Sequence, residues 1–275
     1  MTRTAADKRA AFRALHESGC FTMPNPWDVG SAMALETLGF KALASTSSGM
    51  AWSMGRPDGA VALDEVLIHL SRLAHATSLP LNADFENAFA DTPEGVAANV
   101  ALAVDTGVAG LSVEDWPGAG AEGLYDAPLA AERVQAAREA IDRAGSGVVL
   151  TARCEGLLHG GMSLPAVIAR LQAYAAAGAD CLFAPGLREE TQIQAVVEAL
   201  APRAVNVLSV GLPVAVLAGL GVRRISVGGG LASVAWGHFL GAARELAAEG
   251  TLGGFAGRAP GLELNALFAA AGKGV

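Results

Sequence analysis

Acidic side chains recur at the ends of short apolar runs in this sequence, where they could bind one cation. Asp84 and Glu86 end one run, Glu114 ends the next, and Asp58 lies in the segment after an earlier run. Carboxylates held close together raise one another's pKa, and a divalent cation relieves that conflict. Oxygen ligands without a His or Cys pattern favour Mg²⁺ or Mn²⁺ over zinc. We therefore expect Asp84, Glu86, Glu114 and Asp58 to hold such an ion, directly or through water.

The alternative is that each acid caps a helix or is simply solvated, as most surface acids are. That explanation would suffice for one acid, but three acids at successive strand ends and one in a loop favour the metal site. Arg153, at the end of a further run, places one guanidinium opposite the four carboxylates.

The runs that carry these residues are expected to be strands of one parallel sheet. Helical spacing of apolar residues follows each run, and this alternation is typical of βαβ units. The expected strands are Cys20–Met23, Lys41–Ser45, Leu79–Asp84, Gly110–Glu114, Gly147–Arg153, Asp180–Ala184, Ala204–Leu208 and Arg224–Val227. The expected helices are Ser31–Leu38, Leu63–His75, Pro93–Asp105, Ala130–Arg143, Leu164–Ala177, Glu190–Leu200, Pro213–Leu220 and Leu231–Ala248.

Eight strand–helix pairs in a chain of 275 residues predict a (β/α)8 TIM barrel, with its active site at the C-terminal ends of the strands. A doubly wound sheet is the alternative, but its GxGxxG turn is missing after the first strand, where Met23–Trp27 stands. Glycines mark the helix-to-strand joins, as a left-handed helix end requires. We expect a single barrel domain over residues 1–275, with an N-terminal helix and a helical tail at Leu262–Ala271.

Side-chain alternation assigns faces to the candidate residues, because successive strand residues point to opposite sides. Asp84 and Glu86 should share one side of their strand. Arg153 and Glu155 should also share a side, which turns Cys154 away from the site and weakens it as a nucleophile.

Composition excludes several classes of protein. The 19 Lys and Arg against 27 Asp and Glu give a net charge of −8, which opposes nucleic acid as a partner. Hydrophobic residues make up 52%, which excludes disorder. Three separated cysteines indicate neither a disulfide framework nor zinc. The N-terminus shows no signal peptide, and the uncharged stretch Ala204–Val222 is broken by Gly211-Leu212-Pro213. We expect a soluble, cytoplasmic protein with no membrane partner.

A set of short motifs, in order, carries a family resemblance. The motifs are Leu43-Ala44-Ser45-Thr46-Ser47, Gly55-Arg56-Pro57-Asp58, Pro80-Leu81-Asn82-Ala83-Asp84-Phe85-Glu86, Gly110-Leu111-Ser112-Val113-Glu114-Asp115, Thr151-Ala152-Arg153-Cys154-Glu155 and Ala177-Gly178-Ala179-Asp180. Each motif alone is weakly specific, but their order and spacing are strongly so. Together they resemble the isocitrate lyase / phosphoenolpyruvate mutase superfamily, from about Phe21 to Leu246.

The resemblance implies a (β/α)8 barrel, usually in a homotetramer built from dimers that exchange the last barrel helix. It implies Mg²⁺ at Asp84, with Asp58, Glu86 and Glu114 acting mostly through water. The ligands of the family are 2-oxo acids or their enolates. By this resemblance the substrate carboxylate would meet Ser45, Thr46 and Ser47, and Arg153 would bind an anionic oxygen.

One segment departs from the family pattern. Isocitrate and methylisocitrate lyases carry a Lys-Arg/Lys-Cys-Gly-His loop after the fourth strand, and its Cys is the catalytic acid. Trp116–Tyr125 stands there instead and contains no Cys, Lys or His, which puts isocitrate-type cleavage in doubt. The polar segment of the family's mutases and phosphonopyruvate hydrolases is absent as well.

These features predict a Mg²⁺-dependent carbon–carbon lyase or decarboxylase that cleaves a small 2-oxo dicarboxylic acid through an enolate. Arg153, Ser45 and Asp58 are the expected catalytic residues, because donors near the enolate oxygen stabilise its charge. Two alternatives stay open: phosphonopyruvate hydrolase or phosphoenolpyruvate mutase-type P–C chemistry, and a poorly catalytic 2-oxo acid binding protein.

Four further features have weaker claims. Trp27 could wall the substrate pocket or pack against the first helix, and Asn206 could touch substrate. His159 could reach the site as an acid, although a loop histidine with no catalytic task is the favoured interpretation. The run Gly228–Gly230 could bind an anion at a helix N-terminus, and close backbone packing would explain it equally.

Overall fold

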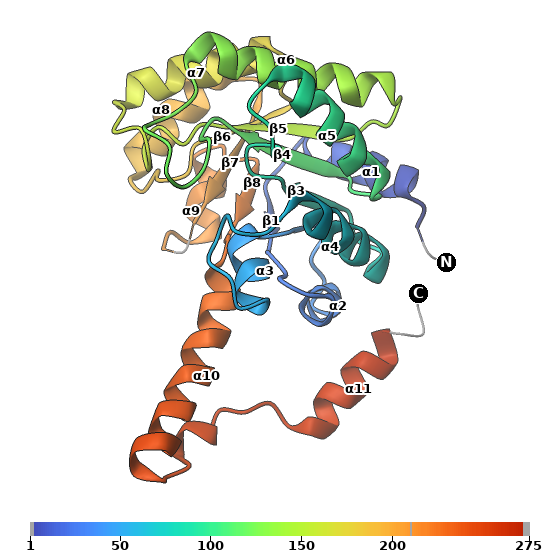
Figure 1. The fold of residues 1–275 in the computed structure, drawn as a ribbon, viewed down its shortest axis with the longest axis vertical. Coiled ribbons are helices and arrows are strands. Elements are labelled where there is room, and N and C mark those ends of the chain that lie inside the picture. Colours follow the sequence, from blue (N-terminus) through green and yellow to red (C-terminus); the bar gives the residue numbers. More distant parts are fainter. Residues whose placement is uncertain (1–2, 210, 272–275) are drawn as a thin grey trace.

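Eight parallel strands form a nearly closed barrel, and this confirms the predicted (β/α)8 fold (Figure 1). The computed structural model describes residues 3–209 and 211–271. The strands are β1 (Phe21–Met23), β2 (Leu43–Ala44), β3 (Leu81–Asp84), β4 (Gly110–Glu114), β5 (Val149–Arg153), β6 (Cys181–Phe183), β7 (Ala204–Leu208) and β8 (Arg224–Ser226). From β2 to β8, neighbours in sequence are neighbours in the sheet, and β1 pairs with β8. Between β1 and β2, the Ala44 N–H donates to the Pro24 carbonyl at 3.1 Å.

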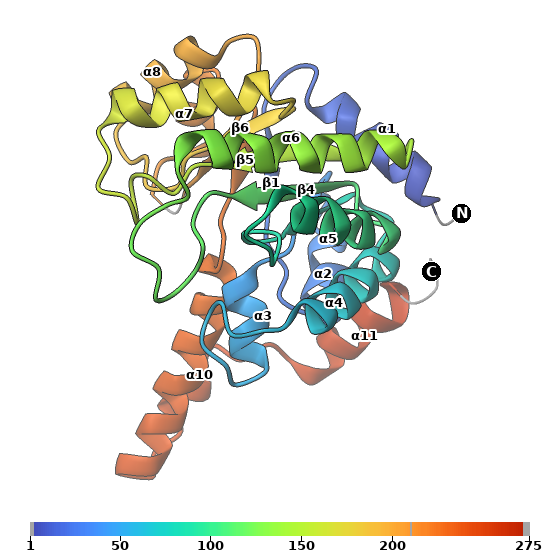
Figure 2. The same cartoon turned by 45° about the horizontal axis from the view of Figure 1, so that its top comes forward.

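Helices surround the barrel and follow the strands in alternation (Figure 2). They are α1 (Ala5–Leu15), α2 (Val29–Thr37), α3 (Ser47–Ser53), α4 (Leu63–Ala76), α5 (Pro93–Asp105), α6 (Ala127–Arg143), α7 (Leu164–Ala176), α8 (Glu190–Leu200), α9 (Val214–Gly219), α10 (Gly230–Glu249), the short 3₁₀ helix η1 (Gly253–Phe255) and α11 (Gly261–Ala271). Glycines with positive φ at Gly39, Gly107, Gly178 and Gly221 precede strands, as predicted.

The N-terminal helix α1 packs across the end of the barrel at which the strands begin. Phe12 is fully buried in a small core with Phe21 and Val149. The Lys8 ammonium donates to the carbonyl oxygens of Ala74 and Thr77, each at 2.6 Å, so its charge is satisfied where α4 ends. This end of the barrel is therefore closed by side chains.

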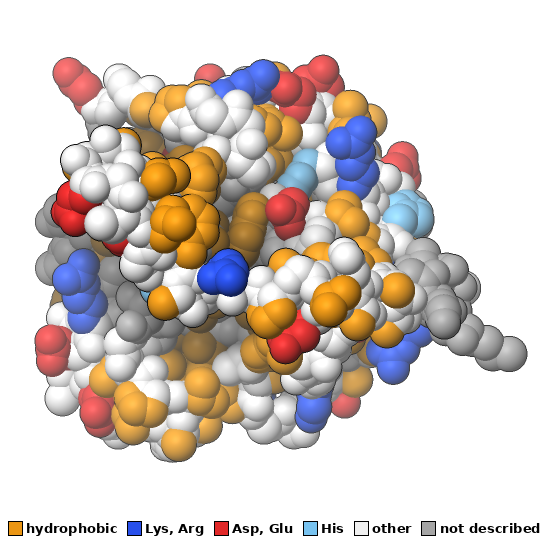
Figure 3. Space-filling model, turned by 90° about the horizontal axis from the view of Figure 1, so that it is seen from below, with side chains coloured by type: hydrophobic (Ala, Val, Ile, Leu, Met, Phe, Trp, Pro, Cys, Tyr) orange, Lys and Arg blue, Asp and Glu red, His pale blue; other side chains and the backbone are white. Residues whose placement is uncertain are grey.

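The helix after the last strand leaves the barrel instead of covering it. In Figure 1, α10 extends away from the strands, and the chain then returns to α11, which packs on α2. Among the described α10 side chains, only Ala232 is buried, whereas Val234 and Phe239 are each 60% exposed. The view from below shows hydrophobic side chains exposed over much of this face (Figure 3). This eighth helix of the barrel contacts η1, but most of its apolar side chains within the described residues stay exposed.

No helix within residues 3–209 or 211–271 combines the length and the apolar character that crossing a bilayer requires. The stretch Ala204–Val222 forms β7 and α9, separated by a turn, as far as it is described.

Candidate active site at the C-terminal end of the barrel

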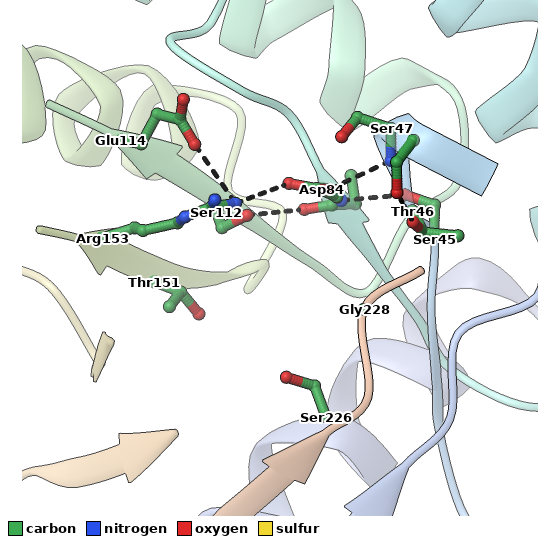
Figure 4. A network of polar contacts seen from close by, with 12 residues as sticks. Ser45, Thr46, Ser47, Asp84, Ser112, Glu114, Thr151, Arg153, Ser226 and Gly228 are labelled. Carbon is green, nitrogen blue, oxygen red and sulfur yellow. Dashed lines mark hydrogen bonds and ion pairs between the residues drawn. The ribbon is translucent and has the colours of Figure 1, made fainter. Parts of the chain in front are cut away.

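The guanidinium of Arg153 lies at the centre of a group of carboxylates (Figure 4). Its Nη1 atom is 3.1 Å from Glu114 Oε2 and 3.3 Å from Asp84 Oδ1, and its Nε atom donates to Glu155 Oε1. Register explains the first contact, because Glu114 of β4 pairs with Arg153 of β5. The Arg153 guanidinium is also 5.4 Å from the centre of the Phe183 ring. The ends of β3, β4 and β5 therefore place one cation among three acids.

The segment after β2 fixes the position of Asp84. The Ser47 N–H, at the start of α3, donates to Asp84 Oδ2 at 3.0 Å. The Ser45 hydroxyl accepts a bond from the Asp84 N–H at 2.8 Å. Thr46 caps α3, because its hydroxyl accepts from the Gly49 N–H at 3.3 Å. The three residues expected to bind substrate thus lie against the carboxylate expected to bind metal.

Glu86 reaches the site by a route that strand alternation did not predict. Strand β3 ends at Asp84, and Glu86 has φ 46°, followed by Ala88 at 59° and Phe89 at 54°. Left-handed conformations at residues other than glycine cost about 1–3 kcal/mol each and cluster at functional sites. The prediction that Glu86 shares a strand face with Asp84 is therefore wrong, although both lie at the barrel mouth.

Arg133 of α6 stabilises the left-handed turn that follows β3. It donates to the carbonyl oxygens of Glu114 at 3.1 Å and Ala90 at 2.7 Å, and also to that of Asn87. Its guanidinium stacks 3.8 Å from the centre of the Tyr125 ring. A side chain that is 1% exposed thus connects the ends of β3 and β4.

The acids at the mouth hold protons more tightly than free carboxyl groups do. Burial raises the pKa of Glu86 to about 7, and the charges of Asp84 and Asp58 add to the shift. Burial also raises the pKa of Glu114, against the opposing effect of Arg153. Partial desolvation raises the pKa of Asp58 although its side chain still contacts solvent. A cation bound at the mouth would therefore favour the ionised forms of these acids.

The donor set fits a hydrated divalent cation better than a fully protein-ligated one. In the described part of the chain, no three Asp, Glu, His or Cys side chains converge closely enough to ligate one ion alone. Mg²⁺ retains several waters and binds proteins through one or two carboxylates. Such an ion would fit beside Asp84, which Ser47 holds in place, with Asp58, Glu86 and Glu114 around it.

Three cavities at this end of the barrel have Arg153 in their linings. One of about 590 Å³ lies beside Pro185 and Leu208. An outer one of about 400 Å³ is lined by Ser47, Asp58, Glu86, Glu114, Arg153 and His159, among others. An inner one of about 40 Å³ lies deeper and is lined by Ser45, Asp84, Arg153 and Asn206, among others. Arg153 lines both the wide outer cavity and the narrow inner one, and the acids of the mouth lie around it.

Two of the expected substrate contacts differ in where they lie. Asn206 lines the inner cavity, and its amide donates to Ser226 Oγ at 3.1 Å. Trp27 is not among the described residues that line the outer or the inner cavity. A Cβ added at Gly49 of α3 would lie only 2.8 Å from the Trp27 Cβ, so the two residues are closely packed. Trp27 thus packs on α3. Close packing also accounts for Gly229, where an added Cβ would lie 2.6 Å from Ser48 Oγ.

Sequence reasoning missed Arg224, which crosses the barrel interior. Its Nε donates to Asn206 Oδ1 at 2.8 Å and its Nη2 to Thr151 Oγ1 at 3.0 Å. It is 1% exposed, and no ion pair to a carboxylate engages it within residues 3–209 and 211–271. The available signal was a charged residue within a predicted strand, next to polar Asn206 and Thr151 on other strands.

The segment Trp116–Tyr125, here called the gate, is fixed at both ends. Asn87 Nδ2 donates to the Pro117 carbonyl at 3.3 Å, and the Tyr125 hydroxyl donates to Asp91 Oδ1 at 2.5 Å. Trp116 and Pro117 line the outer cavity. Glycines 118, 120 and 123 have φ above +80°, which permits tight turns in the exposed middle. The gate borders the cavity with apolar and backbone groups.

A barrel with acids and an arginine at the C-terminal ends of its strands defines the class: a (β/α)8 barrel with an enzyme-like site at the usual end. The sequence model of the phosphoenolpyruvate phosphomutase family matches residues 12–247. The chain belongs to this family, within the isocitrate lyase/PEP mutase superfamily of carbon–carbon lyases and mutases, and it is an enzyme of that type.

Three relatives illustrate the range of the superfamily. A protein of Burkholderia cenocepacia J2315 with a provisional lyase/mutase name is 45% identical, with a TM-score of 0.93 over 96% of this chain and 97% of its own. The 2-methylisocitrate lyase of Escherichia coli is 32% identical over 65% of this chain and 62% of its own. An oxaloacetate acetylhydrolase, solved with its product oxalate, is 26% identical, with a TM-score of 0.84 over 99% of this chain and 100% of its own.

Proposed function

We propose that this enzyme is a Mg²⁺-dependent lyase or decarboxylase of a small 2-oxo dicarboxylic acid of the oxaloacetate class. Relatives that carry the names oxaloacetate acetylhydrolase and 2-methylisocitrate lyase support the substrate class. The observation that carries the proposal is the contact of Arg153 with Asp84 and Glu114 at a cavity of about 400 Å³.

Arg153 would bind and polarise the substrate. Its Nη1 and Nε atoms are engaged by carboxylates, whereas no protein hydrogen bond within the described residues engages Nη2. The Nη2 protons can therefore donate to the oxygen on which enolate charge develops, an interaction that strengthens as the bond breaks. The carboxylates of Glu114, Glu155 and Asp84 raise the pKa of Arg153, although burial opposes this, so the guanidinium stays charged.

Asp84 would be the direct metal ligand, with Asp58, Glu86 and Glu114 around the hydrated ion. When bound, the ion supplies Lewis-acid stabilisation of the ketone and enolate oxygens. Ser45 and Ser47 would keep Asp84 oriented through the bonds to its backbone and carboxylate. Thr46 keeps α3 directed at the same place by capping it. Mn²⁺ would serve in place of Mg²⁺ because it prefers the same oxygen ligands.

The test is Asp84→Ala, with Asp64→Ala on the exposed first turn of α4 as the matched control. We expect Asp84→Ala to lower pyruvate release from oxaloacetate by about 10²-fold or more and to abolish thermal stabilisation by Mg²⁺. Circular dichroism should stay native for both variants. Unchanged turnover and unchanged Mg²⁺ stabilisation in Asp84→Ala would refute the proposal. Stabilisation of the wild type by Mg²⁺ and oxaloacetate without any turnover would instead indicate a binding protein, and turnover of phosphonopyruvate alone would indicate P–C chemistry.

We also propose that the whole chain works as one domain in a cytoplasmic homo-oligomer, a dimer or tetramer. The apolar surface of α10 would cover the barrel of a second copy, so that subunits exchange this helix. Exposed Val234, Trp236, Phe239 and Leu240 support the proposal, because burying such side chains is worth about 1.5–3 kcal/mol each.

A further inference from the structure

A histidine lies in the wall of the outer cavity. His159 follows β5 and lines the same space as Arg153 and Ser47. Its backbone N–H donates to the Glu155 carbonyl at 2.9 Å, which closes a single helical turn. The side chain is 38% exposed, so the imidazole can exchange protons with solvent.

The imidazole is held flat against the first residue of the gate. The rings of His159 and Trp116 are stacked with centroids 3.9 Å apart and an interplanar angle of 5°. Trp116 also lines the outer cavity. Trp116 therefore orients the His159 ring at the wall of this cavity.

A buried carboxylate faces the same imidazole. Glu155 is fully buried, and its Oε1 atom accepts from Arg153 Nε. Its Oε2 atom is buried without a hydrogen-bond partner in the described part of the chain, and it lies 3.9 Å from His159 Nε2. An unsatisfied buried carboxylate oxygen is costly and needs an explanation. The imidazole of His159 is the polar group that faces this oxygen.

We propose that His159 is the catalytic acid that protonates the enolate carbon, with Glu155 and Trp116 as positioning residues. The inference rests on the proposed function. The sequence analysis favoured a loop histidine with no catalytic task, and this inference gives His159 one. It also supplies a proton donor, which the gate lacks because it contains no Cys, Lys or His. Asp58, Glu86 and Glu114 line the same cavity, but the proposed function assigns them to the cation.

The proposed step balances in atoms and charge. The bond between C3 of oxaloacetate and its departing carboxylate breaks, CO₂ leaves, and the electron pair forms the C2–C3 double bond of the enolate. The carbon C3 then takes the proton of the His159 imidazolium while the enolate oxygen re-forms the ketone. Pyruvate results, and neutral His159 takes its next proton from solvent through its exposed edge.

The experiment measures protonation separately from cleavage. Pyruvate is incubated with enzyme and Mg²⁺ in D₂O, and exchange of its methyl protons is followed by ¹H NMR, beside oxaloacetate turnover. The variants are His159→Gln and, as matched control, His75→Gln at the exposed end of α4. Binding of oxalate with Mg²⁺, measured by calorimetry, reports whether the site remains intact.

We expect His159→Gln to lower the exchange rate and kcat by about 10²-fold or more, within the usual range for a general acid. The KM for oxaloacetate and the Kd for oxalate should change less than about threefold, and His75→Gln should match the wild type. An exchange rate in His159→Gln equal to that of the wild type overturns the inference while leaving the lyase proposal intact. A wild type inactive in both assays, by contrast, overturns the proposed function and the inference with it.

The positioning role of Trp116 has its own test. Trp116→Phe retains an aromatic ring for stacking, whereas Trp116→Ala does not. We expect exchange to fall by about tenfold in Trp116→Ala and to recover most of its rate in Trp116→Phe, with oxalate affinity constant. Equal exchange rates in the alanine and phenylalanine variants would show that stacking has no part in the proton transfer.

Discussion

At the scale of single residues, the barrel mouth depends on Arg153. It contacts Asp84, Glu114 and Glu155, and Glu155 is fully buried. Removing one partner of such a buried ion pair leaves an uncompensated charge and commonly costs about 3–5 kcal/mol. The residue that we propose to bind substrate is thus also one that keeps the site folded, so its replacement would confuse the two roles. Asp84 and His159 are better positions for testing chemistry.

A half-buried histidine far from the acids of the mouth predicts how stability depends on pH. Burial and the nearby Arg224 charge lower the pKa of His16 to about 4, while its Nδ1 donates to the Phe12 carbonyl at 2.8 Å. In the unfolded chain the pKa is about 6.5. Between these values the unfolded state binds the proton and the folded state does not, so stability falls as pH falls from 6.5 to about 4.

The measurement is the urea midpoint of unfolding at pH 7 and at pH 5. We expect the wild type to lose more stability than His16→Gln over this interval, by at most about 2 kcal/mol for a fully shifted group. His69, whose pKa burial also lowers to about 4, contributes equally to both proteins and so cancels. An identical pH dependence in the two proteins would contradict a lowered pKa at His16.

At the scale of elements, the limits of the strands show what sequence could and could not predict. Strands β4 and β7 begin and end where expected, because their short Leu- and Val-containing runs are bounded by turn signals. The expected strand Lys41–Ser45 shortens to Leu43–Ala44, since Ser45 is drawn to the backbone of Asp84. Helix α3 was not predicted, because Ser-Ser-Gly has little helix propensity and the helix depends on its cap and on packing.

The sequence predicts which residues form the candidate site better than it predicts how the loops place them. Strand ends are readable in the sequence, and the structure brings Asp84, Glu86, Glu114 and Arg153 together there. The left-handed turn at Glu86 and the stack of Trp116 on His159 depend on loop conformations that no periodicity encodes.

The turn after β3 gives a prediction at this scale. Arg133→Met keeps the length of the side chain but removes its bonds to the carbonyl oxygens of Glu114, Asn87 and Ala90. We expect a loss of about 3 kcal/mol in the free energy of unfolding, because buried carbonyl groups lose charged donors. Loosening of Glu86 should also weaken Mg²⁺ binding by about tenfold or more. Denaturant unfolding and Mg²⁺ titration measure the two effects, and Arg143→Met, at the exposed end of α6, is the control. A fully stable Arg133→Met would show that the turn persists without this side chain.

At the scale of the whole molecule, α10 determines whether the barrel is complete. Seven strands are followed by helices that pack beside them, but α10 projects from the body of the molecule (Figures 1 and 2). If a second copy covers this helix, apparent stability rises with protein concentration.

Phe239→Asp tests this assembly. The side chain is 60% exposed on α10, and its ring packs edge-on against Trp236 with centroids 5.5 Å apart. We expect the variant to lower the mass measured by light scattering from a dimer or tetramer toward a monomer. Ile68→Asp on α4, where the side chain is 53% exposed, is the control and should leave the mass unchanged. A monomeric wild type, or an oligomeric Phe239→Asp, would exclude helix exchange through this surface.

The barrel end that α1 covers affects how substrate and products reach and leave the site. Because Phe12 of α1 is buried in the core at that end, we expect molecules to enter and leave the site at the C-terminal ends of the strands. Under the proposed function, substrate, carbon dioxide and the remaining 2-oxo acid would pass through the same opening. A product that lingers at Arg153 blocks the next substrate molecule, so inhibition by product should be competitive.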